Sequence, residues 1–258
     1  MHIGTEIQEK MSSNCLKDID VVILAGGLGT RIAYKLDGMP KLLAPITGKP
    51  YLEILLKWLA SFGVRRIILS LGHLAGEVKT YLSTKDFKGI QIICAVEPSP
   101  LGTAGGLAFA STYIESDTAL VMNGDSFVDA DLCALVEKHK TCAVEATILC
   151  TRVPNAGRYN SVEIDEMGRV VSFRKKIDDC TPGRINAGVY VMSKSMIQHV
   201  QKVKKGSLET EIFQQMPLGS LNVFCGIFNF IDIGTPEAYA RAPEVFEPYM
   251  KRWNSVTL

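Results

Sequence analysis

The chain has 258 residues, of which 47% are hydrophobic and 21% are charged, with 28 basic and 27 acidic side chains. The net charge of +1 excludes a dedicated nucleic-acid-binding protein, because such a protein carries a strongly basic surface that neutralises phosphates. No apolar stretch is long enough to span a membrane, and the polar residues 1–19 lack the apolar core of a signal peptide. We therefore expect a globular protein in the cytoplasm, with neither nucleic acid nor a membrane as a partner.

The seven cysteines are scattered along the chain and form no C-x-x-C pair. They stand at positions 15, 94, 133, 142, 150, 180 and 225. An odd and scattered set is typical of reduced thiols in a cytosolic protein, and the spacings fit no zinc-binding pattern. His73, His139 and His199 have no acidic or cysteine partner at ligand spacing. We interpret the cysteines as free thiols and the histidines as surface or packing residues.

The first half of the chain alternates short apolar runs with amphipathic segments. Strands are expected over 21–24, 67–71, 90–96 and 119–122, and helices are expected to begin near Pro50, Gly76 and Thr103. The helix at Pro50 has apolar residues at helical spacing and ends at Gly63, a common arrangement of proline and glycine at helix ends. Strands that alternate with helices predict a mostly parallel sheet with right-handed crossovers.

The pattern changes after residue 142. We expect a strand over 143–150, a hairpin formed by 162–165 and 170–173, and a further strand over 187–192. The predicted fold class is α/β, with a Rossmann-like, mostly parallel central sheet flanked by helices and a smaller extension from the second half. We expect one domain over 20–258, composed of halves 20–142 and 143–258, after a polar extension over 1–19. The aromatic residues of 246–253 are expected to dock either on a partner or on the chain's own core.

A glycine-rich loop, Gly26-Gly27-Leu28-Gly29-Thr30-Arg31, follows the first predicted strand. In a doubly wound sheet the ligand lies at this position, and glycines let backbone N–H groups approach phosphate oxygens closely. The loop does not match the dinucleotide-binding fingerprint, because Ile32 stands where that motif requires glycine, and it lacks the Gly-Lys-Ser/Thr of a Walker A loop. These mismatches argue against a NAD-dependent oxidoreductase and against a P-loop enzyme.

Basic residues follow the loop in Pro40-Lys41 and in Pro45-Ile46-Thr47-Gly48-Lys49-Pro50. Together with the glycine loop, these segments resemble the signature of the sugar-phosphate nucleotidyltransferases. Further motifs similar to that family's follow in order: Leu101-Gly102-Thr103-Ala104-Gly105-Gly106, Asn123-Gly124-Asp125-Ser126-Phe127, Asn186-Ala187-Gly188-Val189-Tyr190 and Phe230-Ile231-Asp232-Ile233-Gly234-Thr235-Pro236-Glu237. The resemblance makes 20–142 the nucleotide-binding half and 143–258 the acceptor-sugar half.

This resemblance implies an enzyme that joins a nucleoside triphosphate to a sugar 1-phosphate, which gives an NDP-sugar and pyrophosphate. It implies that Arg31 and Lys41 are catalytic residues that neutralise charge around the α-phosphate, and that Asp125 and Asp232 hold Mg²⁺. The implied nucleotide-binding residues are Leu24, Ala25, Gly26, Gly27, Gly29, Thr30, Glu97, Gly102 and Thr103. The implied sugar-phosphate-binding residues are Gly124, Lys176, Asn186 and Glu209. The alternative for Glu209 is an ordinary glutamate at the N-terminus of a helix. Lys176 is expected to share one cleft with Arg31 and Lys41, so that a local positive charge lies within a nearly neutral chain.

The base preference follows from Glu97, which lies four residues before Leu101, where members of the family place a side chain that faces the base. A carboxylate accepts two hydrogen bonds, which matches the ring N–H and the exocyclic amino group of guanine, whereas uracil and thymine offer one N–H between two carbonyls. Glu97 therefore favours GTP. The alternative is a solvent-exposed glutamate ahead of the turn at 98–100.

The acceptor is less closely defined by the sequence. The motifs at 123–132 and 230–234 and the short length resemble the heptose 1-phosphate guanylyltransferases most. Two residues depart from the pattern: Lys175 stands where relatives carry a glutamate that grips sugar hydroxyls, and Asn160 stands where they tend to carry glycine. Open alternatives are a mannose 1-phosphate guanylyltransferase, a uridylyl- or thymidylyltransferase for another sugar 1-phosphate, and a catalytically silent sensor of NDP-sugars. The sequence also leaves a homo-oligomer open.

Overall fold

The computed structural model of the protein describes residues 14–27, 29–174, 181–253, 256 and 258. Its centre is a nine-stranded sheet. The strands of this sheet are β1 (Asp20–Ala25), β4 (Arg66–Leu71), β5 (Gln91–Val96), β6 (Thr118–Asn123), β8 (Ala146–Val153), β9 (Ser161–Ile164), β10 (Val170–Arg174), β11 (Gly183–Ser193) and β12 (Leu221–Gly226). The main path runs β10-β9-β11-β6-β1-β4-β5, and β8 pairs with β11 and β12 beside it. The pairs among β1, β4, β5 and β6 are parallel, which confirms the sheet predicted for the first half.

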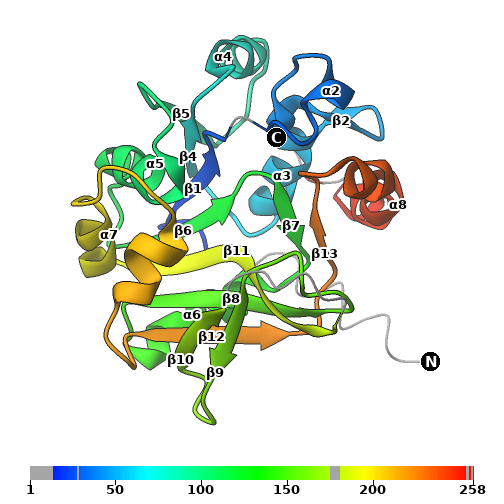
Figure 1. The fold of residues 1–258 in the computed structure, drawn as a ribbon. Helices are drawn as coiled ribbons and strands as arrows, with labels where there is room; N and C mark the ends of the chain where they lie inside the picture. The colour runs from blue at the N-terminus through cyan, green and yellow to red at the C-terminus, as the bar shows by residue number, and fades with distance from the viewer. Residues whose placement is uncertain (1–13, 28, 175–180, 254–255, 257) are drawn as a thin grey trace.

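Helices cover both faces of this sheet (Figure 1). They are α2 (Ala33–Leu36), α3 (Tyr51–Ala60), α4 (Ala75–Ser83), α5 (Gly102–Ala110), α6 (Leu132–Cys142), α7 (Lys194–Val200) and α8 (Pro236–Arg252). Single-turn segments are η2 (Lys41–Leu43), η3 (Ser111–Tyr113), η4 (Leu208–Ile212) and η5 (Phe213–Gln215). The helices predicted near Pro50, Gly76 and Thr103 are α3, α4 and α5, and their starts lie within one residue of the expected positions.

Strands β1, β4 and β6 are buried on both faces, which explains their continuous apolar runs, whereas β5 at the edge of the sheet is only partly buried. In β1, Val21 and Ile23 belong to the core that contains residues of α3 and α8. Val22, between them, belongs to the core that contains residues of α5 and α7. The alternation of side chains along a strand thus divides one apolar run between two cores.

The second half extends the sheet, as predicted. Strand β11 pairs antiparallel with β6, and β9 and β10 form the expected antiparallel hairpin. Two small sheets complete the fold: β7 (Ser126–Val128) pairs with β13 (Phe230–Asp232), and β2 (Pro45–Ile46) pairs with β3 (Lys49–Pro50). Figure 1 shows β7 and β13 beside α8. Because β7 follows the turn after β6 and β13 precedes α8, the pairing of the two strands brings that turn close to the start of the helix.

The aromatic tail docks on the chain's own core. Phe246 is fully buried, and Tyr249 and Trp253 are nearly so. All three rings contact Phe127 of β7, with centroids 5.0, 5.2 and 5.8 Å from its ring centroid. Helix α8 therefore packs against the segment that carries Asp125.

One prediction about the cysteines is wrong. Cys15 and Cys133 form a disulfide with a Cα–Cα distance of 5.5 Å, which joins the segment before β1 to the first turn of α6. The expectation of reduced thiols failed here because the two cysteines lie 118 residues apart in the sequence. The spacing of cysteines along the chain does not reveal that the fold brings these two together. Cys94, Cys142, Cys150 and Cys225 are free, and Cys180 lies outside the described residues. Across the described ranges, no helix has the length and apolar character needed to cross a bilayer.

Candidate active site

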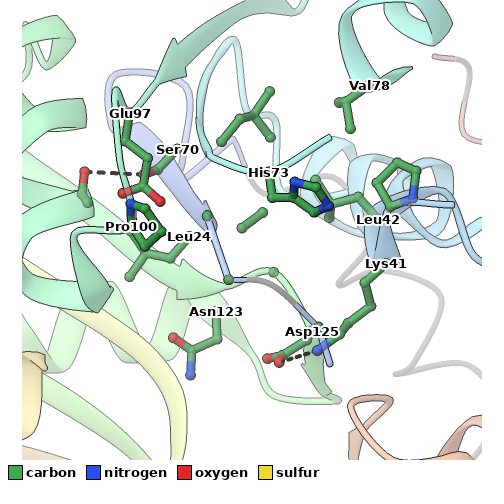
Figure 2. A pocket seen from close by; sticks show the side chains of 18 of the residues that line it. Leu24, Lys41, Leu42, Ser70, His73, Val78, Glu97, Pro100, Asn123 and Asp125 are labelled. Carbon is green, nitrogen blue, oxygen red and sulfur yellow. Dashed lines mark hydrogen bonds and ion pairs between the residues drawn. The ribbon is translucent and has the colours of Figure 1, made fainter. Parts of the chain in front are cut away.

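A cavity of about 340 Å³ opens at the carboxyl ends of β1, β4 and β6 (Figure 2). We call it the large cavity. Its lining includes most of the residues predicted to bind the nucleotide, namely Leu24, Ala25, Gly26, Gly27, Gly29, Glu97, Gly102 and Thr103. Lys41, Gly124 and Asp125 also line it, whereas Thr30 and Arg31 do not. The carboxyl ends of parallel strands are where open α/β sheets bind their ligands.

Glu97 and the pair formed by Lys41 and Asp125 lie at opposite ends of the large cavity (Figure 2). Glu97 follows β5 and is only 8% exposed, so the alternative of a solvent-exposed glutamate is wrong. Its Oε2 accepts a hydrogen bond from the Leu101 backbone N–H at 3.3 Å. Burial raises the pKa of the Glu97 carboxyl, and the hydrogen bond from Leu101 acts in the opposite direction.

At the other end, charged side chains from separate segments converge on the turn after β13. Lys41 Nζ lies 2.9 Å from Asp125 Oδ2, and the Gly234 N–H donates to Asp232 Oδ1 at 2.7 Å. A Cβ built on Gly234 would lie 3.1 Å from Arg31 Nη2 and 3.3 Å from Lys41 Nζ. We call Arg31, Lys41, Asp125 and Asp232 the charged cluster.

Burial and the nearby Asp125 raise the pKa of the Asp232 carboxyl, while Lys41 and Arg31 oppose that shift. The two carboxylates therefore act on each other electrostatically, and both basic residues act on Asp232. Burial and the same two carboxylates also raise the pKa of Tyr51, whose hydroxyl is buried without a hydrogen-bond partner among the described residues. The two carboxylates of the charged cluster thus act electrostatically on Tyr51, the first residue of α3.

A second cavity, of about 160 Å³, adjoins the large one. We call it the small cavity. Its lining comprises Asn123, Asp125, Ser126, Tyr159, Asn160, Asn186, Ala187, Gly188, Glu209, Phe230 and Asp232. Asn123 and Asp125 line both cavities, so the two spaces meet at the charged cluster.

The small cavity carries polar groups on facing elements. Asn186 on β11 donates from Nδ2 to Tyr190 Oη at 2.9 Å and to Glu209 Oε1 at 3.4 Å. Asn160 and Tyr159 precede β9. Lys176, predicted to contact the acceptor phosphate, lies outside the described residues, as does Lys175.

Sequence reasoning missed some lining residues. His73, interpreted as a surface or packing residue, lines the large cavity, and Ser70 of β4 lines it as well. Tyr159 and Ser126 line the small cavity. The available signal was position: Ser70 and His73 flank the carboxyl end of a predicted parallel strand, where ligands bind. The interpretation of His139 as a packing residue is confirmed, because its buried ring contacts Thr147 Oγ1 at 3.1 Å.

The doubly wound sheet, the glycine loop and the charged cluster between two cavities define an α/β enzyme that handles phosphates. Comparison with known proteins narrows this class: the model of the nucleotidyl transferase family matches residues 20–247. The chain therefore belongs to the nucleotidyl transferase family.

Relatives of known activity agree with that assignment. The chain is 33% identical over 229 residues to the mannose-1-phosphate guanylyltransferase of Mycobacterium tuberculosis, a match that covers 86% of the chain but only 63% of that relative. It is 34% identical over 224 residues to the D-glycero-alpha-D-manno-heptose 1-phosphate guanylyltransferase of Campylobacter jejuni, a match that covers 86% of the chain and 97% of that relative. The chain thus spans less than two thirds of the mycobacterial relative and nearly all of the Campylobacter one.

A solved structure confirms the fold class. The crystal structure of HddC from Yersinia pseudotuberculosis superimposes with a TM-score of 0.79 at 34% identity, covering 89% of this chain and all of that one. HddC has also been crystallised in complex with GMP-PN.

Proposed function

We propose that this protein transfers the guanylyl group of GTP to a sugar 1-phosphate, with heptose 1-phosphate as the favoured acceptor. The observation that carries the proposal is the meeting of the two cavities at Asp125, with the charged cluster at their junction. The reaction joins two anions and needs one site for each, with positive charge between them. The family assignment and the retention of Arg31, Lys41, Asp125 and Asp232 favour an enzyme over a sensor of NDP-sugars.

The large cavity fits the nucleotide. Its glycine loop supplies backbone N–H groups for phosphates, and Glu97 at the far end presents a buried carboxylate to the base. We propose that the Glu97 carboxylate accepts the ring N–H and the exocyclic amino group of guanine. The solved complex of HddC with GMP-PN, a guanine nucleotide, supports guanine as the base.

Asp125 and Asp232 fit a magnesium ion. Among the described residues there is no cluster of three or more histidine, cysteine or acidic side chains that could hold a metal ion. Mg²⁺ does not need one, because it is usually held by one or two carboxylates together with substrate phosphates and water. Burial and the negative charge of Asp125 raise the pKa of the Asp232 carboxyl, and a divalent cation bound between the two carboxylates would relieve their repulsion. When bound, the ion would screen the negative charge of the triphosphate.

The transfer is a displacement at the α-phosphorus. An oxygen of the sugar 1-phosphate forms the new bond to the α-phosphorus as the bond to pyrophosphate breaks, so no covalent intermediate on the protein is required. We propose that Arg31 and Lys41 neutralise the charge that builds up on the α-phosphate and the leaving group. Lys176 is proposed to hold the acceptor phosphate. The protein's main contribution is to align the two phosphates and to reduce their repulsion.

The small cavity is proposed to hold the sugar. Asn186 and Glu209 offer an amide and a carboxylate that can bind hydroxyl groups, and Asn160 lines the same space. Full-length similarity to the Campylobacter relative supports a heptose, whereas similarity to the mycobacterial relative supports mannose as the second candidate. The homo-oligomer, the cytoplasmic location and the division into halves at residue 142 stay predictions from the sequence.

The test is a substrate panel. The protein is incubated with GTP, UTP, dTTP or ATP, with Mg²⁺ and one sugar 1-phosphate at a time, and pyrophosphate release is measured. We expect the highest kcat/KM for GTP with heptose 1-phosphate. Higher activity with UTP or dTTP would show that the assignment of Glu97 to guanine is wrong, and higher activity with mannose 1-phosphate would replace the acceptor.

A further inference from the structure

Glycines surround the carboxylate of Glu97. Gly26 follows β1, Gly72 follows β4, and Gly106 lies in α5. A Cβ on Gly72 would lie 2.6 Å from Glu97 Oε1, and a Cβ on Gly106 would lie 3.5 Å from Glu97 Oε2. A Cβ on Gly26 would collide with Oε1 as well. Oε1 is therefore confined between Gly26 and Gly72. A side chain at either position would fill the space that Oε1 occupies. We call this space the glycine slot.

The rest of the environment fixes where the slot lies. The Glu97 backbone N–H donates to Leu71 O at 2.8 Å, which ties the end of β5 to the end of β4 beside Gly72. Ser70 is buried, and its hydroxyl donates a hydrogen bond to Gly106 O at 3.2 Å, which links β4 to α5. Within the described parts of the chain, the Glu97 carboxylate accepts one hydrogen bond, from the Leu101 backbone N–H. Steric confinement, more than hydrogen bonding, therefore sets the position of this carboxylate.

Base selection needs that position to be fixed. Guanine is distinguished from other bases by two donors on one edge, and both reach a carboxylate only if its two oxygens lie in the plane of the base. A displacement of about 1 Å can remove much of such an interaction. Gly26 belongs to the phosphate loop, so its contribution cannot be separated from phosphate binding. Gly72 lies between β4 and α4, away from the charged cluster.

We infer that Gly72 is a positioning residue for base specificity: by lacking a side chain, it holds the Glu97 carboxylate where both oxygens face guanine. This inference rests on the proposed use of GTP. It adds a residue outside the glycine loop and outside the predicted site. ITP is a suitable probe, because hypoxanthine keeps the ring N–H and lacks the exocyclic amino group.

The experiment measures the ratio of kcat/KM for GTP to that for ITP in four proteins: the wild type, Gly72→Ala, Glu97→Ala and the double variant. We expect a wild-type ratio of roughly 10- to 100-fold, the range for a hydrogen bond to a charged group. Gly72→Ala should lower the ratio to near that of Glu97→Ala, mainly through KM for the nucleotide. The KM for the sugar 1-phosphate should not change.

The double variant separates a positioning role from general damage. A Cβ on Gly72 would also lie 2.6 Å from Gly26 O, so Gly72→Ala can disturb the loop directly. If Gly72 acts through Glu97, its substitution does not change the ratio in the Glu97→Ala background. Gly76→Ala is the matched control, because no atom lies within 4 Å of a Cβ there, and it should keep the wild-type ratio.

Glu97→Asp tests the same idea in a protein whose slot is intact. It keeps the carboxylate but withdraws it by one methylene, so the ratio should fall nearly as far as in Glu97→Ala. The inference is overturned if Glu97→Asp, or a folded Gly72→Ala protein, keeps the wild-type ratio. It is also overturned if Gly72→Ala lowers the ratio of kcat/KM for GTP to that for ITP equally in the wild-type and the Glu97→Ala backgrounds. A wild type that prefers UTP instead refutes the proposed base, and one that does not distinguish GTP from ITP refutes the proposed hydrogen bond to the exocyclic amino group.

Discussion

Lys41 Nζ and Asp125 Oδ2 lie 2.9 Å apart and form an ion pair at the junction of the two cavities. The pair joins η2 to the turn after β6, across 84 residues of sequence. Both side chains are partly exposed, at 18% and 36%, so water screens the pair and we attribute little stability to it. Its significance is positional, because it holds an ammonium group beside a carboxylate at the point where the two phosphates are proposed to meet.

The first prediction concerns Lys41. Lys41→Ala should lower kcat by about 10²- to 10³-fold, the usual effect of removing one group that stabilises charge in a transition state. Lys41→Arg should recover only part of the activity, because the planar guanidinium places its charge differently. Steady-state kinetics with GTP and the sugar 1-phosphate provide the measurement. A change confined to KM would mean that Lys41 only binds substrate.

The second prediction concerns Gly234. A Cβ there would lie 2.7 Å from Asp232 Oδ1 and 3.1 Å from Arg31 Nη2, so Gly234→Ala should displace groups of the charged cluster. We expect kcat to fall by about 10-fold or more while the fold is retained. Kinetics and a thermal midpoint, compared with those of Gly76→Ala, separate the two effects. Unchanged kcat in a folded Gly234→Ala protein would show that these groups tolerate displacement.

Much of this arrangement could be predicted from the sequence. The β1 strand and its glycine loop are contiguous, so apolar character and turn residues are sufficient to identify them. The pairing of β7 with β13 could not be predicted, because these three-residue strands lie about 100 residues apart and show no alternation. The glycine slot was hidden for the same reason: Gly26, Gly72 and Gly106 are distant in sequence and meet only around the Glu97 side chain.

The third prediction concerns the disulfide. The bond between Cys15 and Cys133 closes a loop of 118 residues, and such a bond typically contributes about 2–4 kcal/mol to the free energy of unfolding. Reduction should lower the urea midpoint of the wild type and leave that of Cys133→Ala unchanged. Thiol titration of the denatured, unreduced protein should find two fewer thiols than the seven cysteines. Seven free thiols would contradict the bond.

The fourth prediction concerns pH. Burial lowers the pKa of His139 below its ordinary value of 6.5, with Glu145 acting in the opposite direction. Because the unfolded state then binds the proton more readily, stability is fully present above pH 6.5 and falls as the pH drops below it, by at most about 1.4 kcal/mol per pH unit. Urea unfolding between pH 7.5 and 5.5 should therefore show a smaller loss in His139→Gln than in the wild type. The exposed His199 provides the control, and an equal loss in His139→Gln and His199→Gln would assign the effect elsewhere.

The most direct measurement follows the α-phosphorus of GTP. In a single turnover with GTP labelled at the α-phosphate, Mg²⁺ and heptose 1-phosphate, the label should pass into GDP-heptose without appearing on the protein, and one pyrophosphate should form for each GDP-heptose. Lys41→Ala should slow both products equally. Label that stays on the protein, or that leaves as GMP without a GDP-sugar, would contradict direct guanylyl transfer between the two cavities.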